Sequence, residues 1–127
     1  HLHETRGRVE FRKSDMFDQT VAVKSKHIPG LLTRLSSFLD AKAVAPGQPW
    51  GGSDTQFISA GPLGRVVPKL RHAHLTRDIS VFYTVDGSDP TVVKLYGVFD
   101  HRESGTGDPA NIKKQKSLAQ QLGHQRI

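Results

Sequence analysis

The spacing of hydrophobic residues changes along this 127-residue chain, and that change limits the folds open to it. In residues 31–44, leucine and phenylalanine recur every three to four positions, which predicts an amphipathic helix. In residues 79–85, apolar and polar side chains alternate, which predicts a β-strand. A turn follows at Asp86-Gly87, and residues 91–101 are expected to return as a second strand. Helices and antiparallel strands therefore share the chain, and the predicted fold class is α+β.

Weaker patterns complete the order of elements. They predict a strand over residues 7–13, a helix over 14–27, an extended segment over 65–75 and a C-terminal helix over 108–123. Asp108 and Pro109 suit the N-cap and the first turn of that last helix. The expected order is β-α-α-β-β-β-α, with two N-terminal helices and a C-terminal helix packed on a small antiparallel sheet. We expect residues 1–127 to form a single domain.

Residues 45–64 interrupt this pattern with five glycines, three prolines and the only tryptophan, Trp50. Such a composition predicts a long loop or an insertion, which Trp50 and Phe57 can order by becoming buried. A loop of this length in a compact domain is often functional, although it can be an insertion and nothing more.

The charge of the chain is the first indication of function. Eighteen Lys and Arg against twelve Asp and Glu give a net charge of +6 and a pI near 9.9. This charge favours a polyanionic partner such as nucleic acid, although a well-solvated surface also explains it. The absence of cysteine excludes disulfides and thiolate metal sites, and no apolar run is long enough to cross a bilayer.

The segment "KLRHAHLTRD", residues 69–78, carries the densest set of chemically active side chains. It precedes the strand over 79–85, and the returning strand ends at His101. Because strand ends at one rim of a sheet can converge, these groups are expected to meet. The candidates are Lys69, Arg71, His72, His74, Asp78 and His101, and Tyr83 or Tyr96 could add a hydroxyl.

A basic protein with such a set suits RNA cleavage without a metal ion or another cofactor. One histidine would take the proton of the ribose 2′-OH, another would protonate the 5′-oxygen, and an arginine would hold the phosphate. Other interpretations stay open. His72 and His74 share one face of a strand and can be half-exposed sheet residues, or metal ligands with His101 as a third. Asp78 can simply cap a turn.

The segment from Arg71 to Tyr83 has the form R-x-A-H-x-x-x-D-x-x-x-x-Y, and a hydrophobic strand then leads to His101. This pattern resembles the RelE/ParE superfamily of bacterial toxins, most closely the YafQ-like mRNA interferases. The resemblance covers residues 62–102, and the RelE-like fold that it implies agrees with the expected element order. Gly61 stands where members of that branch often have a histidine.

The resemblance implies a role for each matched residue. His74 and Asp78 would match the acid–base and orienting residues, His101 the closing histidine and Arg71 the phosphate-contacting arginine. It also implies a cytoplasmic toxin of a toxin–antitoxin system that cuts mRNA on the ribosome and is neutralised by a cognate antitoxin. Further RNA contacts are expected from Lys69, His72, Arg77, Tyr83, Tyr96, Arg102, Lys113 and Lys114.

Three other functions stay open on the sequence alone. A non-catalytic, basic nucleic-acid-binding module would depend on its lysines and arginines and not on His74 or His101. An RNase toxin domain cut from a larger delivered effector would use the same histidines. A gyrase-directed toxin of the same superfamily would need no acid–base histidines, so the set of His74, Asp78 and His101 argues against it.

Overall fold

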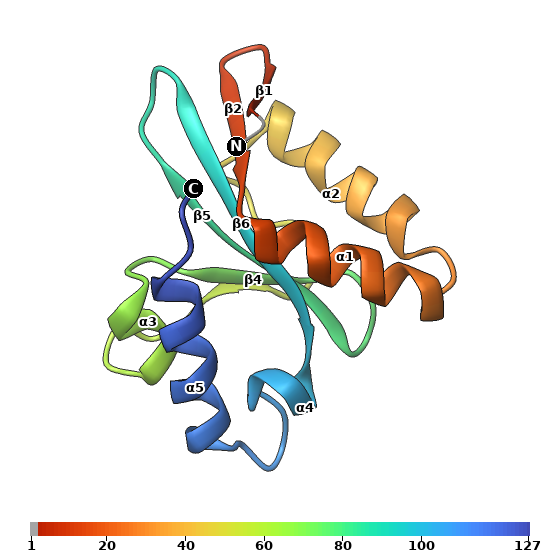
Figure 1. Ribbon diagram of the computed structural model, residues 1–127. Coiled ribbons are helices and arrows are strands. Elements are labelled where there is room, and N and C mark those ends of the chain that lie inside the picture. The colour runs from red at the N-terminus through yellow and green to blue at the C-terminus, as the bar shows by residue number, and fades with distance from the viewer. Residues whose placement is uncertain (1–2) are drawn as a thin grey trace.

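The computed structural model describes residues 3–127, which form one mixed sheet with helices on both of its faces (Figure 1). Its elements are β1 (His3–Arg6), β2 (Val9–Lys13), α1 (Asp15–His27), α2 (Leu31–Val44), β3 (Asp54–Gln56), α3 (Pro62–Val66), β4 (Arg71–His74), β5 (Ile79–Asp86), β6 (Thr91–Asp100), α4 (His101–Ser104) and α5 (Ile112–Gly123). The sheet order is β1-β2-β6-β5-β4-β3. The predicted α+β class is confirmed, with both N-terminal helices and the C-terminal helix in place.

The middle of the sheet is the predicted antiparallel meander. β4 pairs with β5, and β5 pairs with β6, with a register shift between Phe82 and Tyr83. One pair departs from the antiparallel expectation, because β2 runs parallel to β6 with Val9 opposite Thr91. β1, which the sequence patterns did not predict, extends the sheet beyond β2 as an antiparallel edge strand.

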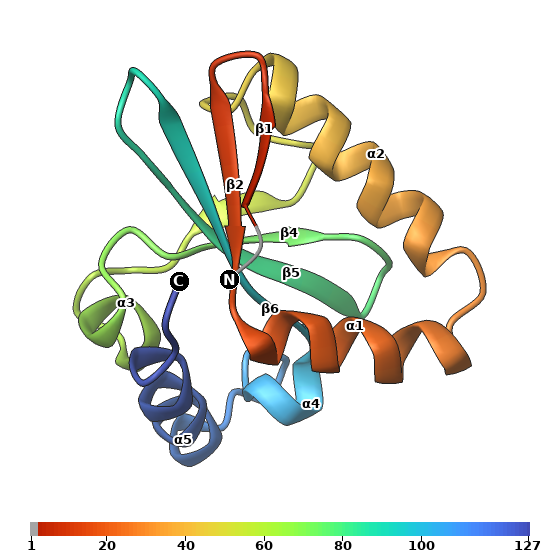
Figure 2. The same cartoon turned by 45° about the horizontal axis from the view of Figure 1, so that its top comes forward.

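Each face of the sheet has its own hydrophobic core because side chains alternate along a strand. On one face, Val81 and Tyr83 of β5 join a cluster with Phe17 of α1 and Phe38 of α2. On the other face, Phe82 belongs to a second cluster, which draws on α3 and α5. Figure 2 shows the two helix pairs on opposite sides of the sheet.

Three segments differ from the sequence predictions. The expected loop over 45–64 contains β3 and the start of α3, and residues 65–70 form the end of α3 and a turn instead of extended chain. The C-terminal helix begins at Ile112 and not at 108, because the side chain of Asn111 accepts a hydrogen bond from the backbone N–H of Lys114 and caps it. Among residues 3–127, no helix is long and apolar enough to span a bilayer.

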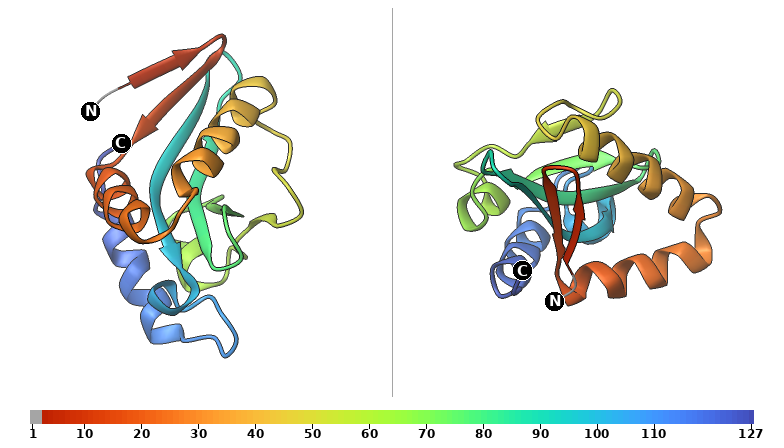
Figure 3. Two further views of the ribbon diagram at one scale, coloured as in Figure 1. Left: turned by 90° about the vertical axis from the view of Figure 1, so that its right-hand side faces the viewer. Right: turned by 90° about the horizontal axis from the view of Figure 1, so that it is seen from above.

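The short helix α4 begins where β6 ends, at the lower end of the sheet (Figure 3). Asp100 and Glu103 form a capping box, in which each side chain accepts a hydrogen bond from the backbone N–H of the other residue. Lys24 of α1 forms a salt bridge of 2.8 Å with Glu103. Burial opposes the charge on Lys24, but the contacts with Glu103 and Asp100 outweigh it and raise the pKa of Lys24. These contacts fix the first residue of α4, His101.

Candidate functional site

Two histidines from distant parts of the chain meet at the lower end of the sheet. His74 is the last residue of β4 and His101 is the first residue of α4. Their Nε2 atoms lie 3.1 Å apart, and the ring centroids are separated by 5.3 Å. Strict alternation along β6 would have turned His101 toward the core, but the chain leaves the strand at Asp100 and the side chain stays 36% exposed. The convergence predicted from the strand ends is therefore present.

Each ring has a hydrogen-bond partner on its far side. His101 Nδ1 lies 3.2 Å from Asp78 Oδ1, and the backbone N–H of His101 donates to the same oxygen at 3.1 Å. His74 Nδ1 lies 3.3 Å from the carbonyl oxygen of Ser53. Both oxygens only accept, so both Nδ1 atoms carry protons when these bonds form. A hydrogen bond between the two Nε2 atoms then requires a proton on one of them.

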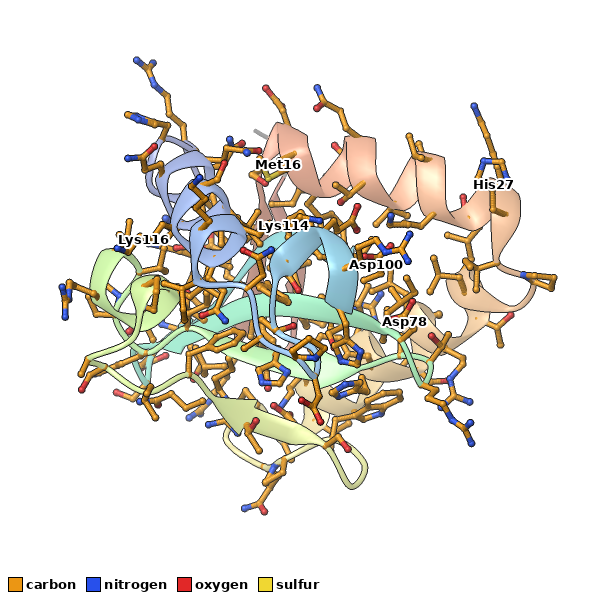
Figure 4. All side chains as sticks on the ribbon, turned by 90° about the horizontal axis from the view of Figure 1, so that it is seen from below. Met16, His27, Asp78, Asp100, Lys114 and Lys116 are labelled. Carbon is orange, nitrogen blue, oxygen red and sulfur yellow. The ribbon has the colours of Figure 1, made fainter. Side chains whose placement is uncertain are left out.

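Two hollows flank this histidine pair, and Figure 4 views this end of the molecule with Asp78, Asp100 and Lys114 labelled. His74 lines the first, which we call the Trp50 hollow, of about 740 Å³. Its lining includes Arg34, Trp50, Gly52, Ser53, His74 and Arg77. His101 lines the second, the Asp78 hollow, of about 610 Å³. Its lining includes Asp78, Asp100, His101, Arg102, Asp108 and Lys114.

Arg71 does not join the histidine pair. It shares with Ala73 the face of β4 that is turned toward α1 and α2, whereas His74 lies on the opposite face. Its guanidinium donates to Asp54 twice, from Nε to Oδ1 at 3.3 Å and from Nη2 to the backbone oxygen at 2.9 Å. The expectation that Arg71 and His74 line one surface is therefore not met, since the alternation of side chains along β4 separates them.

Asp54 of β3 is the centre of a buried polar network behind β4. Its carboxylate accepts hydrogen bonds from Lys42 Nζ at 2.9 Å, from the backbone N–H of Trp50 at 2.8 Å and from the hydroxyl of Tyr83. Burial by itself would raise the pKa of Asp54, but these bonds outweigh it and lower the pKa. Tyr83 is fully buried in this network, and its burial raises the pKa of its hydroxyl. Tyr83 is thus inaccessible to RNA, contrary to the sequence prediction.

His72 lies on the same face of β4 as His74 but is held in a different way. Its ring stacks on Phe57, with centroids 4.4 Å apart and an interplanar angle of 30°, and its Nε2 lies 3.2 Å from Thr55 Oγ1. Burial, followed by the nearby His74, lowers the pKa of His72 to about 4. His72 is therefore a neutral packing residue at pH 7, and a direct contact with RNA phosphate does not fit its position.

The depressed pKa of His72 has a measurable effect on stability. Between pH 6.5 and about 4 the unfolded chain binds a proton at this residue and the folded chain does not, so stability falls as the pH falls. We expect His72→Phe, which keeps the stacking on Phe57, to reduce this loss by roughly 2 kcal/mol at pH 4. Urea unfolding of the parent and the variant from pH 7 to 4 measures the difference. Equal slopes with pH for the two proteins would contradict the assignment.

The other predicted RNA contacts divide into two groups. Arg77 lines the Trp50 hollow, while Arg102 and Lys114 line the Asp78 hollow, so all three are close to the histidine pair. A second group lies elsewhere on the fold and lines neither hollow. Lys69 is in the exposed turn before β4, Tyr96 packs on the cluster beneath α5, and Lys113 is on the exposed first turn of α5.

Sequence patterns did not identify several residues that shape the site. Arg34 of α2 donates a hydrogen bond to the backbone oxygen of Leu75, directly beside His74. Ser53 supplies the carbonyl for His74, and Asp54 anchors Trp50 through the network described above. These residues belong to an ordinary amphipathic helix and a glycine-rich segment. The only sequence feature that pointed to this part of the site was Trp50, an isolated tryptophan in a long stretch of glycine, proline and polar residues.

Metal binding by His72, His74 and His101 is one of the alternatives that the sequence left open. Across residues 3–127, the histidine, aspartate and glutamate side chains form no group of three or more that could hold a metal ion. The row of Asp78, His101 and His74 is instead joined by hydrogen bonds from end to end.

Comparison with known proteins identifies the fold. No protein-family model and no curated protein matches the sequence. A chain of the Escherichia coli DinJ–YafQ complex superposes with a TM-score of 0.53 and 16% identity, covering 72% of this chain and 92% of the other. A metal-bound toxin from Helicobacter pylori superposes with a TM-score of 0.50 and 20% identity, covering 73% and 94% of the two chains. The resemblance read from residues 62–102 therefore extends to the architecture, and this chain has the RelE-like fold that the resemblance implied.

Proposed function

We propose that this protein is a cytoplasmic toxin of a toxin–antitoxin system and acts as an endoribonuclease on mRNA. The observation that carries the proposal is the contact between His74 and His101, with Nε2 atoms 3.1 Å apart and Asp78 behind His101. With both Nδ1 atoms protonated, a hydrogen bond between the two Nε2 atoms joins one neutral imidazole to one protonated imidazole. These are the two species that a base and an acid need near neutral pH.

The proposed reaction uses both rings at one phosphate. The neutral imidazole takes the proton of the ribose 2′-OH, and the 2′-oxygen attacks phosphorus. The bond from phosphorus to the 5′-oxygen breaks, and the protonated imidazole gives its proton to that oxygen. The products are a 2′,3′-cyclic phosphate and a 5′-OH end, and the pair again holds one proton.

The direct contact of the two rings is the arrangement without RNA. A phosphate at this position must lie between the rings, so they separate when RNA binds. The half-exposed side chain of His101 has room for this movement, and catalytic hydrogen bonds often adjust when substrate arrives. Arg77 on one side, and Arg102 and Lys114 on the other, supply the positive charge that the phosphorane requires.

Two partners follow from the same proposal. The similarity to a chain of the DinJ–YafQ complex supports an antitoxin protein that neutralises this chain. Cleavage on the ribosome is the finer part of the proposal, and the exposed lysines near the start of α5, Lys113, Lys114 and Lys116, are available for contact with ribosomal RNA.

Cleavage of a defined RNA by the purified chain tests this function. We expect fragments with 2′,3′-cyclic phosphate ends, no cleavage of the same oligonucleotide with 2′-O-methyl groups, and full activity in EDTA. Binding without cleavage, both with free RNA and in a ribosomal translation assay, would instead support a non-catalytic nucleic-acid-binding module. Loss of cleavage in EDTA would contradict the proposed use of two histidines.

A further inference from the structure

We infer that the Trp50 hollow binds the nucleotide next to the scissile phosphate, with the other, non-scissile phosphate of that nucleotide between Arg34 and Arg77 and its base against Trp50. This inference rests on the proposed function, because it takes the histidine pair as the place of cleavage. His74 lines the Trp50 hollow and His101 lines the Asp78 hollow, so the pair lies at the boundary between them. An RNA strand with its phosphate at this boundary has one neighbouring nucleotide in each hollow.

Charge distinguishes the two hollows. The described lining of the Trp50 hollow contains Arg34, Arg77 and His74 but no acidic side chain. The Asp78 hollow instead contains Asp78, Asp100 and Asp108 beside Arg102 and Lys114. Guanidinium groups bind phosphate oxygens through paired hydrogen bonds, whereas carboxylates repel them. A phosphate-bearing group is therefore expected to bind more tightly in the Trp50 hollow.

Arg34 is held in place before any ligand arrives. Its Nε donates to the backbone oxygen of Leu75, and its guanidinium lies 6.0 Å from the centre of the Trp50 ring. Neither Arg34 nor Arg77 has a carboxylate partner among the ion pairs of residues 3–127. A fixed arginine loses less side-chain freedom on binding, so its contacts with a ligand are stronger.

Trp50 gives the hollow a rigid wall. Its ring meets Phe38 edge-on at 5.7 Å, and its backbone N–H donates to the buried Asp54. An arginine plane next to an aromatic ring is a typical surface for an unstacked RNA base. The next residues, Gly51 and Gly52, leave open space, since a Cβ atom at either position would meet nothing within 4 Å. Room for a base thus exists beside Trp50.

The single tryptophan allows a direct test. We titrate the full chain with each of the four ribonucleoside 3′-monophosphates and follow Trp50 fluorescence. At least one nucleotide is expected to give a saturable change, and Arg34→Gln and Arg77→Gln are each expected to weaken its binding at least fivefold. Arg8→Gln removes the same charge from the exposed turn between β1 and β2 and is the matched control. No change with any nucleotide, or equal affinity in all three variants, would overturn the inference.

A second variant separates this inference from the proposed function. Gly52→Phe places a large side chain in open space without the strain of a left-handed backbone, because Gly52, unlike Gly51 with its φ of 67°, does not have a left-handed conformation. It is expected to abolish the nucleotide signal and to change which phosphates the enzyme cleaves.

The outcomes separate the two proposals. Unchanged cleavage sites in Gly52→Phe would refute the nucleotide site in the Trp50 hollow and leave the RNase proposal intact. If the parent chain cleaves no RNA but gives a nucleotide signal that depends on Arg34 and Arg77, nucleotide binding in the Trp50 hollow would stand and the RNase proposal would be refuted. Full competition by inorganic phosphate at equal concentration would reduce the hollow to an anion site and overturn its assignment to a nucleotide.

Discussion

Replacing His101 with alanine is expected to slow RNA cleavage by about 10²–10⁴-fold, the usual loss when a general acid or base is removed. His74→Ala should cause a similar loss, because the proposed reaction needs one ring as the base and the other, 3.1 Å away, as the acid. The double variant should be little worse than either single variant, since residues that act as a unit are not additive. Single-turnover cleavage of a defined RNA measures all three rates.

The control for this experiment is His124→Ala, which removes an exposed imidazole next to the end of α5 and away from both hollows. Asp78→Asn is expected to give a smaller loss than the histidine variants, because its amide oxygen can still accept the backbone N–H of His101. Urea midpoints equal to that of the parent would show that the variants are folded. Full cleavage by folded His101→Ala and His74→Ala would refute the catalytic assignment.

Loss of the Asp54 charge is expected to destabilise the fold by about 3–5 kcal/mol, as when one partner of a buried ion pair is removed. Asp54→Asn keeps an oxygen for the N–H of Trp50 but leaves the ammonium of Lys42 without its counter-charge. The side chains of Lys42 and Asp54 are only 2% and 0% exposed, so water cannot take over. Urea unfolding at pH 7 measures the change in the free energy of unfolding.

The double variant Lys42→Met with Asp54→Asn isolates the cause of this loss. It removes the buried charges of Lys42 and Asp54 and fills the space of the lysine chain, while Arg71, the other cation at Asp54, is 26% exposed and stays in contact with water. We therefore expect it to recover most of the stability lost in the single variant. A double variant as unstable as Asp54→Asn would show that the hydrogen bonds of the carboxylate, and not its charge, hold β3 to the sheet. A loss below about 1 kcal/mol for Asp54→Asn would show that the ion pair is not needed.

The elements of this protein that were predicted correctly have hydrophobic residues at a strong, regular spacing along the sequence. Alternation over 79–85 and the leucine spacing over 31–44 describe faces that are buried along their whole length, so local pattern and tertiary structure agree. β3 was missed because its three residues lie among glycines and prolines, and only its pairing with β4 makes it a strand. The parallel contact of β2 with β6 joins segments about 80 residues apart, which no local pattern reports.

The candidate site was predictable in part for the same reason. His74, Asp78 and His101 lie at the ends of strands whose pairing the alternating pattern implied. Arg71 was expected beside the histidines from its place in the same strand and from the resemblance, but residues 71 and 74 point to opposite faces of a strand. The start of α4 had a readable signal, since Asp100 and Glu103 have the spacing of a capping box. No sequence pattern pointed to Arg34, because its position at the site depends on how α2 packs beside β4.

The position of β6 determines when the site can exist during synthesis. The strand nearest the C-terminus lies between β2 and β5, so every earlier strand waits for residues 91–100 before the sheet is continuous. His101 follows immediately, and His74 cannot form its contact with His101 until then. Contacts over such long separations form slowly. A chain still emerging from the ribosome therefore lacks the proposed catalytic pair until residue 101 has been made and β6 has joined the sheet.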